Sequence, residues 1–380
     1  MDTINLHDER LQWLRFVLSP DRPLPEIQDW QGLYDFTINQ AIAGICSPAQ
    51  FDQARLTRQV LVRWVLLTEQ LKFKNGQINK QSAMVATKLK ESGFRCCILK
   101  GQGNAAMYAQ PGLRMPGDID VWVEADKDKL YAWVKELYPQ DKVSFKHIKF
   151  SMFKQTEVDV HYTPLKFYHP VHNRRLQQWI EANKEEQMTH YVRLADTDAD
   201  VAIPTIEFNA VYQMGHILIH LMDEGIGLRH MVDYYYVLKH LRAASASERE
   251  KIKKVWNSLG MLRLASAVMW IEHEALGLPK EYLLAEPDER KGKLLLEDIL
   301  EGGNFGHHSS RQECRKHGRY AKGWANLLHL IKLFSCFPGE ASFRMLRKIR
   351  TFGKIVLKKT EKRYNYVRKK KNLPVPGSHE

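Results

Sequence analysis

Two aspartates separated by a single residue, Asp118 and Asp120, are the side chains best suited to chemistry in this 380-residue sequence. On a strand, residues two apart point to the same face, so both carboxylates leave one face while Ile119 and Val121 enter the core. Two like charges this close are unfavourable unless a cation lies between them. A hard divalent ion with oxygen ligands, Mg²⁺ or alternatively Mn²⁺, is the simplest such partner, so we predict a metal site here.

The elements around these aspartates form an ordered set. An apolar strand, 96–99, runs into a turn that contains two glycines, and a short helical segment continues to Tyr108. A loop rich in Pro and Gly, 111–117, then leads into the strand that carries the aspartates. The whole run from Leu99 to Val123, LKG…YAQPGLRMPGDIDVWV, resembles the uncharacterised nucleotidyltransferase family called nucleotidyltransferase family 5. That family belongs to the DNA polymerase β-like nucleotidyltransferase superfold.

The resemblance implies a third acidic residue on a neighbouring strand, flanked by apolar residues. The segment EVDVHY supplies Asp159 between two valines, and Glu157 is the alternative. This residue would complete the metal site and help to deprotonate the attacking hydroxyl. His161 lies on the same strand face, where it could act as a general base or hold Asp159 in place.

The resemblance further implies transfer of an NMP from an NTP to a hydroxyl or phosphate of an acceptor. Backbone N–H groups at Gly101 and Gly103 would approach the β- and γ-phosphates. Lys100 and Arg114 would neutralise phosphate charge, and Arg114 could do so bidentately. Lys100 could instead point off the end of its strand into solvent.

Two departures from the superfold leave other functions open. Gln102 follows the first glycine where the superfold usually has Ser or Gly, and the gap to Asp118 is long. One alternative is therefore a non-catalytic protein that binds nucleic acid or another polyanion on a nucleotidyltransferase-like scaffold. Another is a zinc enzyme built on His216 and His220, although HILIH lacks the glutamate of the HExxH motif.

A polar seam lies downstream, on segments with helical spacing. His216 and His220 are four residues apart, as are Arg229 and Asp233, which could form an ion pair. We expect these side chains to pack near the active-site cleft, either as structural groups or in contact with nucleotide or acceptor.

The apolar periodicity predicts helical regions on either side of a few short strands. The resemblance implies that these strands form a small mixed sheet, the nucleotidyltransferase core of an α+β fold. The N-terminal helices are predicted over 30–43, 48–73 and 78–92, with a turn at Asn75-Gly76 between the last two. Four regions follow: a helical region at 1–94, the core at 95–205, a second helical region at 206–340 and a partly disordered basic tail at 341–380.

The net charge of +13 is concentrated near the C-terminus. Between residues 344 and 371 there are thirteen Lys and Arg against one acid, Glu361. This segment is either a solvated helical tail or a site for a polyanion: nucleic acid, anionic lipid or a phosphorylated substrate. No apolar run approaches the ~18 residues of a membrane span. Five cysteines without CxxC spacing, and no signal-peptide pattern, lead us to expect a cytoplasmic protein.

Overall fold

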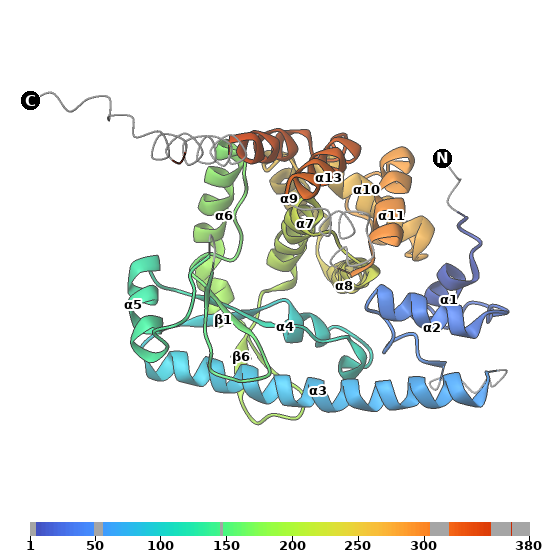
Figure 1. The fold of residues 1–380 in the computed structure, drawn as a ribbon, viewed down its shortest axis with the longest axis horizontal. Helices are drawn as coiled ribbons and strands as arrows, with labels where there is room; N and C mark the ends of the chain where they lie inside the picture. The colour runs from blue at the N-terminus through green and yellow to red at the C-terminus, as the bar shows by residue number, and fades with distance from the viewer. Residues whose placement is uncertain (1–4, 49–55, 145–146, 305–318, 351–365, 367–380) are drawn as a thin grey trace, which may run out of the picture.

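The computed structural model describes residues 5–48, 56–144, 147–304, 319–350 and 366 (Figure 1). It confirms the predicted α+β class: a small mixed sheet lies among a much larger number of helices. In the described part of the chain, no helix is both long enough and apolar enough to span a bilayer.

Of the described residues before the sheet, three long segments are α-helical: α1 (Glu9–Leu18), α2 (Trp30–Asn39) and α3 (Arg58–Glu91). Each begins after a residue whose side chain accepts a hydrogen bond from a backbone N–H of the first turn, namely Asp8, Asp29 and Thr57. The helix α3 runs along the lower edge of the molecule, beneath the sheet (Figure 1).

The predicted turn at Asn75-Gly76 is wrong, because α3 continues through both residues. The Asn75 side chain is buried, and its amide donates to the carbonyls of Leu71, Gly112 and Arg114 at 2.8–3.0 Å. A glycine inside a helix costs about 1 kcal/mol relative to alanine. The hydrogen bonds of Asn75 to Gly112 and Arg114 offset this cost. A residue pair that is typical of turns is therefore accommodated inside a helix. The predicted start at Pro48 adjoins 49–55, which lie outside the described residues.

The main sheet has the strand order β1-β2-β4-β3. Its members are β1 (Cys96–Leu99), β2 (Ile119–Val123), β3 (His147–Lys149) and β4 (Val158–His161). The central pair β2–β4 is parallel, and the two outer pairs are antiparallel. Short helical pieces, α4 (Gly101–Ala105) and η2 (Pro111–Leu113), connect β1 to β2, and α5 (Lys127–Leu137) follows β2.

The two faces of the sheet belong to different cores. Ile98 and Val121 pack with residues of α3 and α5 on one face. Leu99 and Trp122, one residue further along each strand, join the large helical core on the other face. This alternation follows from the two-residue period of a strand. It places Asp120, two residues from Trp122, on the face that looks toward the C-terminal helices.

A long helix and a small second sheet complete this part of the chain. After α6 (Pro170–Thr189), β5 (Tyr191–Arg193) and β6 (Asp200–Ala202) form an antiparallel pair. Three aspartates, Asp196, Asp198 and Asp200, lie in and beside the connection between these strands.

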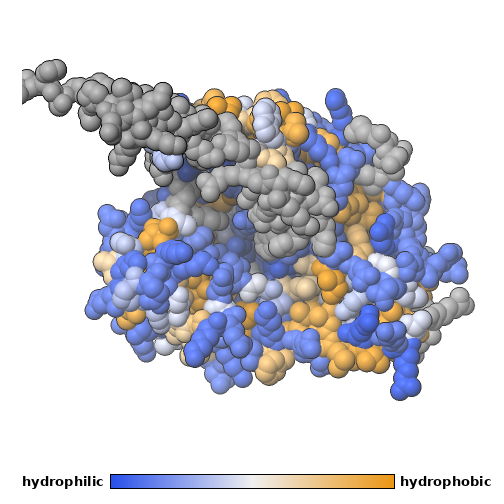
Figure 2. Space-filling model, viewed as in Figure 1, coloured by the Kyte–Doolittle hydropathy of each residue, from blue (hydrophilic) through white to orange (hydrophobic). Residues whose placement is uncertain are grey.

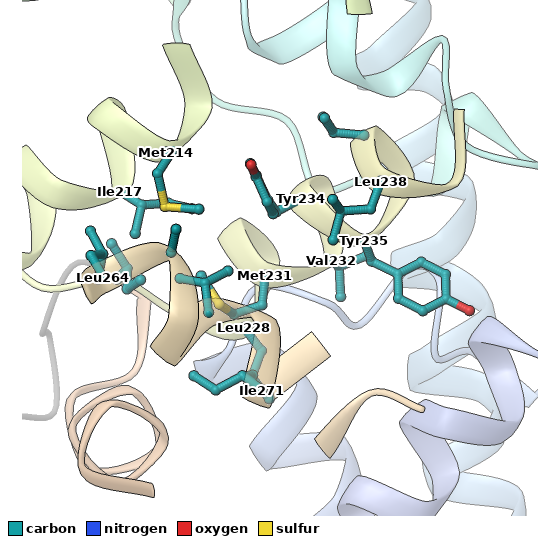
Figure 3. Close-up of a cluster of buried hydrophobic side chains, with 14 of the residues drawn as sticks. Met214, Ile217, Leu228, Met231, Val232, Tyr234, Tyr235, Leu238, Leu264 and Ile271 are labelled. Atoms are coloured by element: carbon teal, nitrogen blue, oxygen red, sulfur yellow. The ribbon is translucent and has the colours of Figure 1, made fainter. Parts of the chain in front are cut away.

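The C-terminal half is helical, as predicted. Its helices are α7 (Ile206–Asp223), α8 (Leu228–His240), η3 (Leu241–Ala243), α9 (Ala246–Ser258), α10 (Leu262–Trp270), the π-helical η4 (Ile271–Ala275), η5 (Lys280–Tyr282), α11 (Glu289–Gly302) and α13 (Arg319–Lys332), and 338–350 is also helical. Figure 3 shows their core, where Met214 and Ile217 of α7 meet Leu228 and Met231 of α8 and Leu264 of α10.

The predicted division into four regions stays a prediction. Most of the predicted tail, at 351–365 and 367–380, lies outside the described residues, so its predicted disorder does too. Among the described cysteines, Cys46, Cys96, Cys97 and Cys336 are free thiols.

Candidate active site

The three predicted carboxylates come together where the two central strands, β2 and β4, begin. Oxygen atoms of Asp118, Asp120 and Asp159 all lie within 4.8 Å of one another. The parallel pairing of β2 with β4 puts Asp120 directly opposite Asp159, so their side chains leave the same face. Asp118 comes just before β2 and is exposed, whereas the other two are buried. The site therefore has one open side.

The alternative third carboxylate, Glu157, lies elsewhere. Its side chain is 72% exposed and pairs with Lys149, with 3.0 Å between Nζ and Oε2. It precedes β4 and is not part of the three-carboxylate cluster.

Lys100 points into the site rather than into solvent. Because β1 pairs Leu99 with Asp120, the residue after Leu99 arrives beside that carboxylate. The Lys100 Nζ lies 2.5 Å from Asp120 Oδ2 and 3.1 Å from His216 Nε2. The Lys100 backbone has φ +48°, a conformation that side-chain-bearing residues rarely adopt. Lys100 therefore supplies a buried positive charge to the acidic cluster.

The charges of this cluster are strongly coupled. Burial raises the pKa of Asp159, and Asp120 and Asp118 raise it further, to about 7. Burial also opposes the charge on Asp120, but Lys100 and His161 outweigh it, so the Asp120 pKa falls well below its usual value. For Lys100 the carboxylates outweigh burial and raise the pKa. Asp120 is therefore ionised at neutral pH, and Asp159 is the group whose charge responds to its surroundings.

Two histidines border the carboxylates. The sequence predicts that His161 acts as a general base or holds Asp159. In the structure, its Nε2 lies 2.7 Å from Asp120 Oδ1, so the ring holds Asp120 instead. His147 Nε2 lies 3.4 Å from Asp159 Oδ2. Sequence reasoning missed His147 because only the pairing of β3 with β4, which sets His147 opposite His161, brings it to the site.

Arg114 takes a different position from the one expected. Its Nε and Nη2 each donate to one carboxylate oxygen of Asp233 at 2.7 Å. Tyr108 donates its hydroxyl to the same carboxylate at 2.6 Å. All three side chains are buried. The bidentate partner of Asp233 is thus Arg114, while Arg229 directs Nη1 to the carbonyl of Met115 at 3.3 Å.

The predicted histidine seam lies against the acidic site. The rings of His216, His220 and His230 pack together, with centroids 4.2–5.9 Å apart. Among the described residues, two groups place three metal-binding side chains within 4.8 Å: the three aspartates, and His147 with Asp159 and His161. Neither group contains His216 or His220, so the zinc alternative gains no support.

The two glycines of the first turn have different surroundings. Gly101 has φ +35°, and a Cβ there would lie 3.6 Å from the carbonyl of Asp118. Its backbone is therefore next to the backbone of Asp118. A Cβ at Gly103 would instead meet the Ile203 side chain at 3.4 Å, so Gly103 permits close packing against β6.

Comparisons with known proteins give a match to one family. A model of the uncharacterised nucleotidyltransferase family matches residues 26–277. An antigenic nucleotidyltransferase-like protein from Paracoccidioides brasiliensis is similar at 13% identity, over 48% of this chain and 91% of its own length. Its TM-score is 0.29, too low to bear on the fold. No curated protein matches. Since the family model spans most of the chain, this protein belongs to the uncharacterised nucleotidyltransferases.

Proposed function

We propose that this protein transfers an NMP from an NTP to a hydroxyl or phosphate of an acceptor, with a divalent metal ion, Mg²⁺ or Mn²⁺, at Asp118, Asp120 and Asp159. One observation carries the proposal: three carboxylates converge where the paired strands β2 and β4 begin, and one of the three, Asp118, is exposed. Membership of a nucleotidyltransferase family supports the reaction class.

The donor set suits a hard divalent cation. Carboxylate oxygens are the ligands that Mg²⁺ and Mn²⁺ prefer. When bound, the ion would neutralise phosphate charge in an in-line displacement at the α-phosphorus. Burial, and to a smaller extent the charges of Asp120 and Asp118, raise the pKa of Asp159 to about 7, so three ionised carboxylates beside Lys100 are unfavourable without a further cation. A cation at this position would compensate their charge.

The residues of the chain then have distinct roles. Lys100 neutralises the charge of Asp120. With a metal ion bound to that carboxylate, the Lys100 ammonium group would instead contact a phosphate. Asp159, whose pKa is near neutrality, is suited to accept the proton of the attacking hydroxyl. His161 fixes the orientation of Asp120. Gly101 leaves room for the phosphates beside Asp118.

Two predicted phosphate contacts are not included in this proposal. Arg114 already donates from two nitrogens to Asp233, and breaking a buried bidentate pair is costly. Gly103 packs against Ile203 instead of lining the open side. The acceptor remains defined only by chemistry, as a hydroxyl or phosphate, and the basic C-terminal segment favours an anionic one.

The test is labelling with α-labelled NTP and Mg²⁺, using purified full-length protein alone and with a lysate as the source of acceptors. We expect label to transfer to the protein itself or to a lysate component. The variant Asp118→Asn/Asp120→Asn should lower the rate by about 10³-fold, the upper range for loss of electrostatic stabilisation. Labelling that persists at the wild-type rate would sink the metal-site assignment.

The third carboxylate has a matched control on the same segment. Asp159→Asn should abolish most of the activity, while Glu157→Gln, two residues away and exposed, should retain it. The reverse result would move the third role to Glu157. The non-catalytic alternative predicts no labelling by any of these proteins, with polyanion binding unchanged by the aspartate substitutions.

A further inference from the structure

We propose that the C-terminal helices form a docking surface for a bilayer that contains anionic lipid. The surface consists of the exposed apolar side chains of α13 and of 334–350, together with the exposed Arg347 and Arg350. It is separate from the acidic site and does not depend on the reaction proposed there.

The helix α13 has two apolar faces, of which only one is buried. Leu330 and Leu333 are fully buried below it, and His329 Nε2 lies 2.9 Å from Asp298 Oδ2 of α11. These contacts fix the rotation of α13 about its own axis. Its opposite face is therefore presented outward, away from the core.

That outward face carries large apolar side chains at helical spacing. Trp324, Leu328 and Ile331 are 63%, 61% and 55% exposed, and positions i, i+4 and i+7 share one side of a helix. Phe334, just after α13, is 41% exposed. Figure 2 shows apolar side chains on the upper edge of the molecule, where Figure 1 places α13 and the helix that follows it. Clustered exposed apolar side chains of this size mark an interaction site.

The next helix repeats the pattern with basic residues interleaved. In 338–350, Leu346 and Ile349 are 50% and 58% exposed, and the exposed Arg347 and Arg350 alternate with them. Arg and Lys can place their charged ends at the headgroups while their stems cover apolar surface. The thirteen Lys and Arg between 344 and 371, against Glu361 alone, extend this positive charge along the sequence.

Charge complementarity selects the occupant. A helix face with Trp, Leu and Ile beside many Lys and Arg is typical of segments that lie in the interface of a membrane. An anionic surface attracts such segments further. Nucleic acid would use the basic residues but would leave Trp324, Leu328 and Ile331 without a role. A second copy would bring two strongly basic segments together.

The test is co-sedimentation of the full-length protein with vesicles of phosphatidylcholine, with and without phosphatidylglycerol. We expect binding to the anionic vesicles and much weaker binding to the neutral ones. The variant Trp324→Ser/Leu328→Ser/Ile331→Ser should bind roughly tenfold or more weakly, because it removes the apolar part of the surface. Replacing Lys358, Lys359, Lys362 and Arg363 by Gln should weaken binding to anionic vesicles alone.

A matched control removes exposed apolar side chains from another helix. Val62, Leu66 and Phe73 of α3 are 48%, 58% and 70% exposed, and their replacement by Ser should leave vesicle binding unchanged. Equal binding by wild type and the α13 variant would overturn the proposal. So would equal binding to neutral and anionic vesicles, tight RNA binding that the α13 variant retains with no vesicle binding, or a dimer that this variant dissociates.

Discussion

Two clusters of charged side chains both draw on the stretch between Lys100 and Asp120, and they differ in charge balance. In the first, one lysine, Lys100, faces three carboxylates, two of which are buried. In the second, Arg114 meets the carboxylate of Asp233 through two hydrogen bonds, and Tyr108 donates a third. The first cluster holds excess negative charge, whereas the second is neutral overall.

The difference in charge balance distinguishes a pair that serves the structure from a cluster that, in our proposal, serves the reaction. Burial of a charge is costly unless a partner compensates it, so Arg114 and Asp233 depend on each other and loss of either one alone destabilises the fold. At Asp159, burial and then the unbalanced charges of Asp120 and Asp118 raise the pKa of the carboxyl. Such a site gains most from a cation that the chain itself does not supply. The sequence had grouped Arg114 with the first cluster, and the tertiary structure assigns it to the second.

The balanced cluster should show the largest effect on stability. Arg114→Leu leaves the Asp233 carboxylate buried without its main partner, so we expect the free energy of unfolding to fall by about 3–5 kcal/mol. Urea denaturation measures this change. The double variant Arg114→Leu/Asp233→Leu removes both charges and should recover most of the loss. If Arg114→Leu unfolds like wild type and loses only activity, the assignment of this pair to structure is wrong.

The unbalanced cluster should respond to metal instead. Mg²⁺ at a hundred times its Kd stabilises a protein that binds it only when folded by about 2.7 kcal/mol. Thermal unfolding of the wild type should shift upward with Mg²⁺, and that of Asp118→Asn/Asp120→Asn should not. The variant Arg114→Leu/Asp233→Leu serves as the control and should keep the shift. A shift that survives the aspartate substitutions would place the ion elsewhere.

The two clusters should also depend on pH in opposite directions, with an effect per pH unit that is smaller than the two effects above. The folded-state pKa of Asp159 is raised to about 7, so its contribution to metal-free stability is present below about pH 4 and is lost as pH rises through 7. The pKa of Asp233 is lowered to about 2, mainly by Arg114 working against burial. Its contribution is present above about pH 4 and is lost as pH falls through 2.

Urea denaturation across pH tests this contrast. Each proton contributes a slope of about 1.4 kcal/mol per pH unit or less. Asp159→Asn should flatten the decline of stability between pH 4 and 7, and Asp233→Asn should flatten the decline below pH 4. A wild-type slope retained by Asp159→Asn would show that another group titrates in the upper range.

Much of the active-site stretch could be predicted from the sequence. The strand at Cys96–Leu99, the glycine turn and the strand after Asp118 were expected, because apolar runs between turn residues give strong local signals. Asp159 was expected beside Asp118 and Asp120 from the family resemblance, and the structure places it there. The fold class and the family were also predicted, and both are confirmed.

Local signals failed where a distant contact decided the outcome. Asn75-Gly76 is typical of a turn, but hydrogen bonds from Asn75 to the loop at Gly112 and Arg114 hold it in a helix. His147 carries no signal of its own, and only strand pairing brings it to Asp159. The contact of Lys100 with Asp120 likewise depends on the register of β1 against β2.

The sequence by itself identified Asp118 and Asp120 as candidates for chemistry, because residues two apart on a strand point to the same face. Only the tertiary structure decided which charges are already paired. The parallel pairing of β2 with β4 sets Asp120 against Asp159, and the packing of α8 sets Asp233 against Arg114. Pairing depends on distances between segments far apart in the chain, which local spacing does not encode. The excess negative charge at the start of β2 and β4 is therefore a property of the fold.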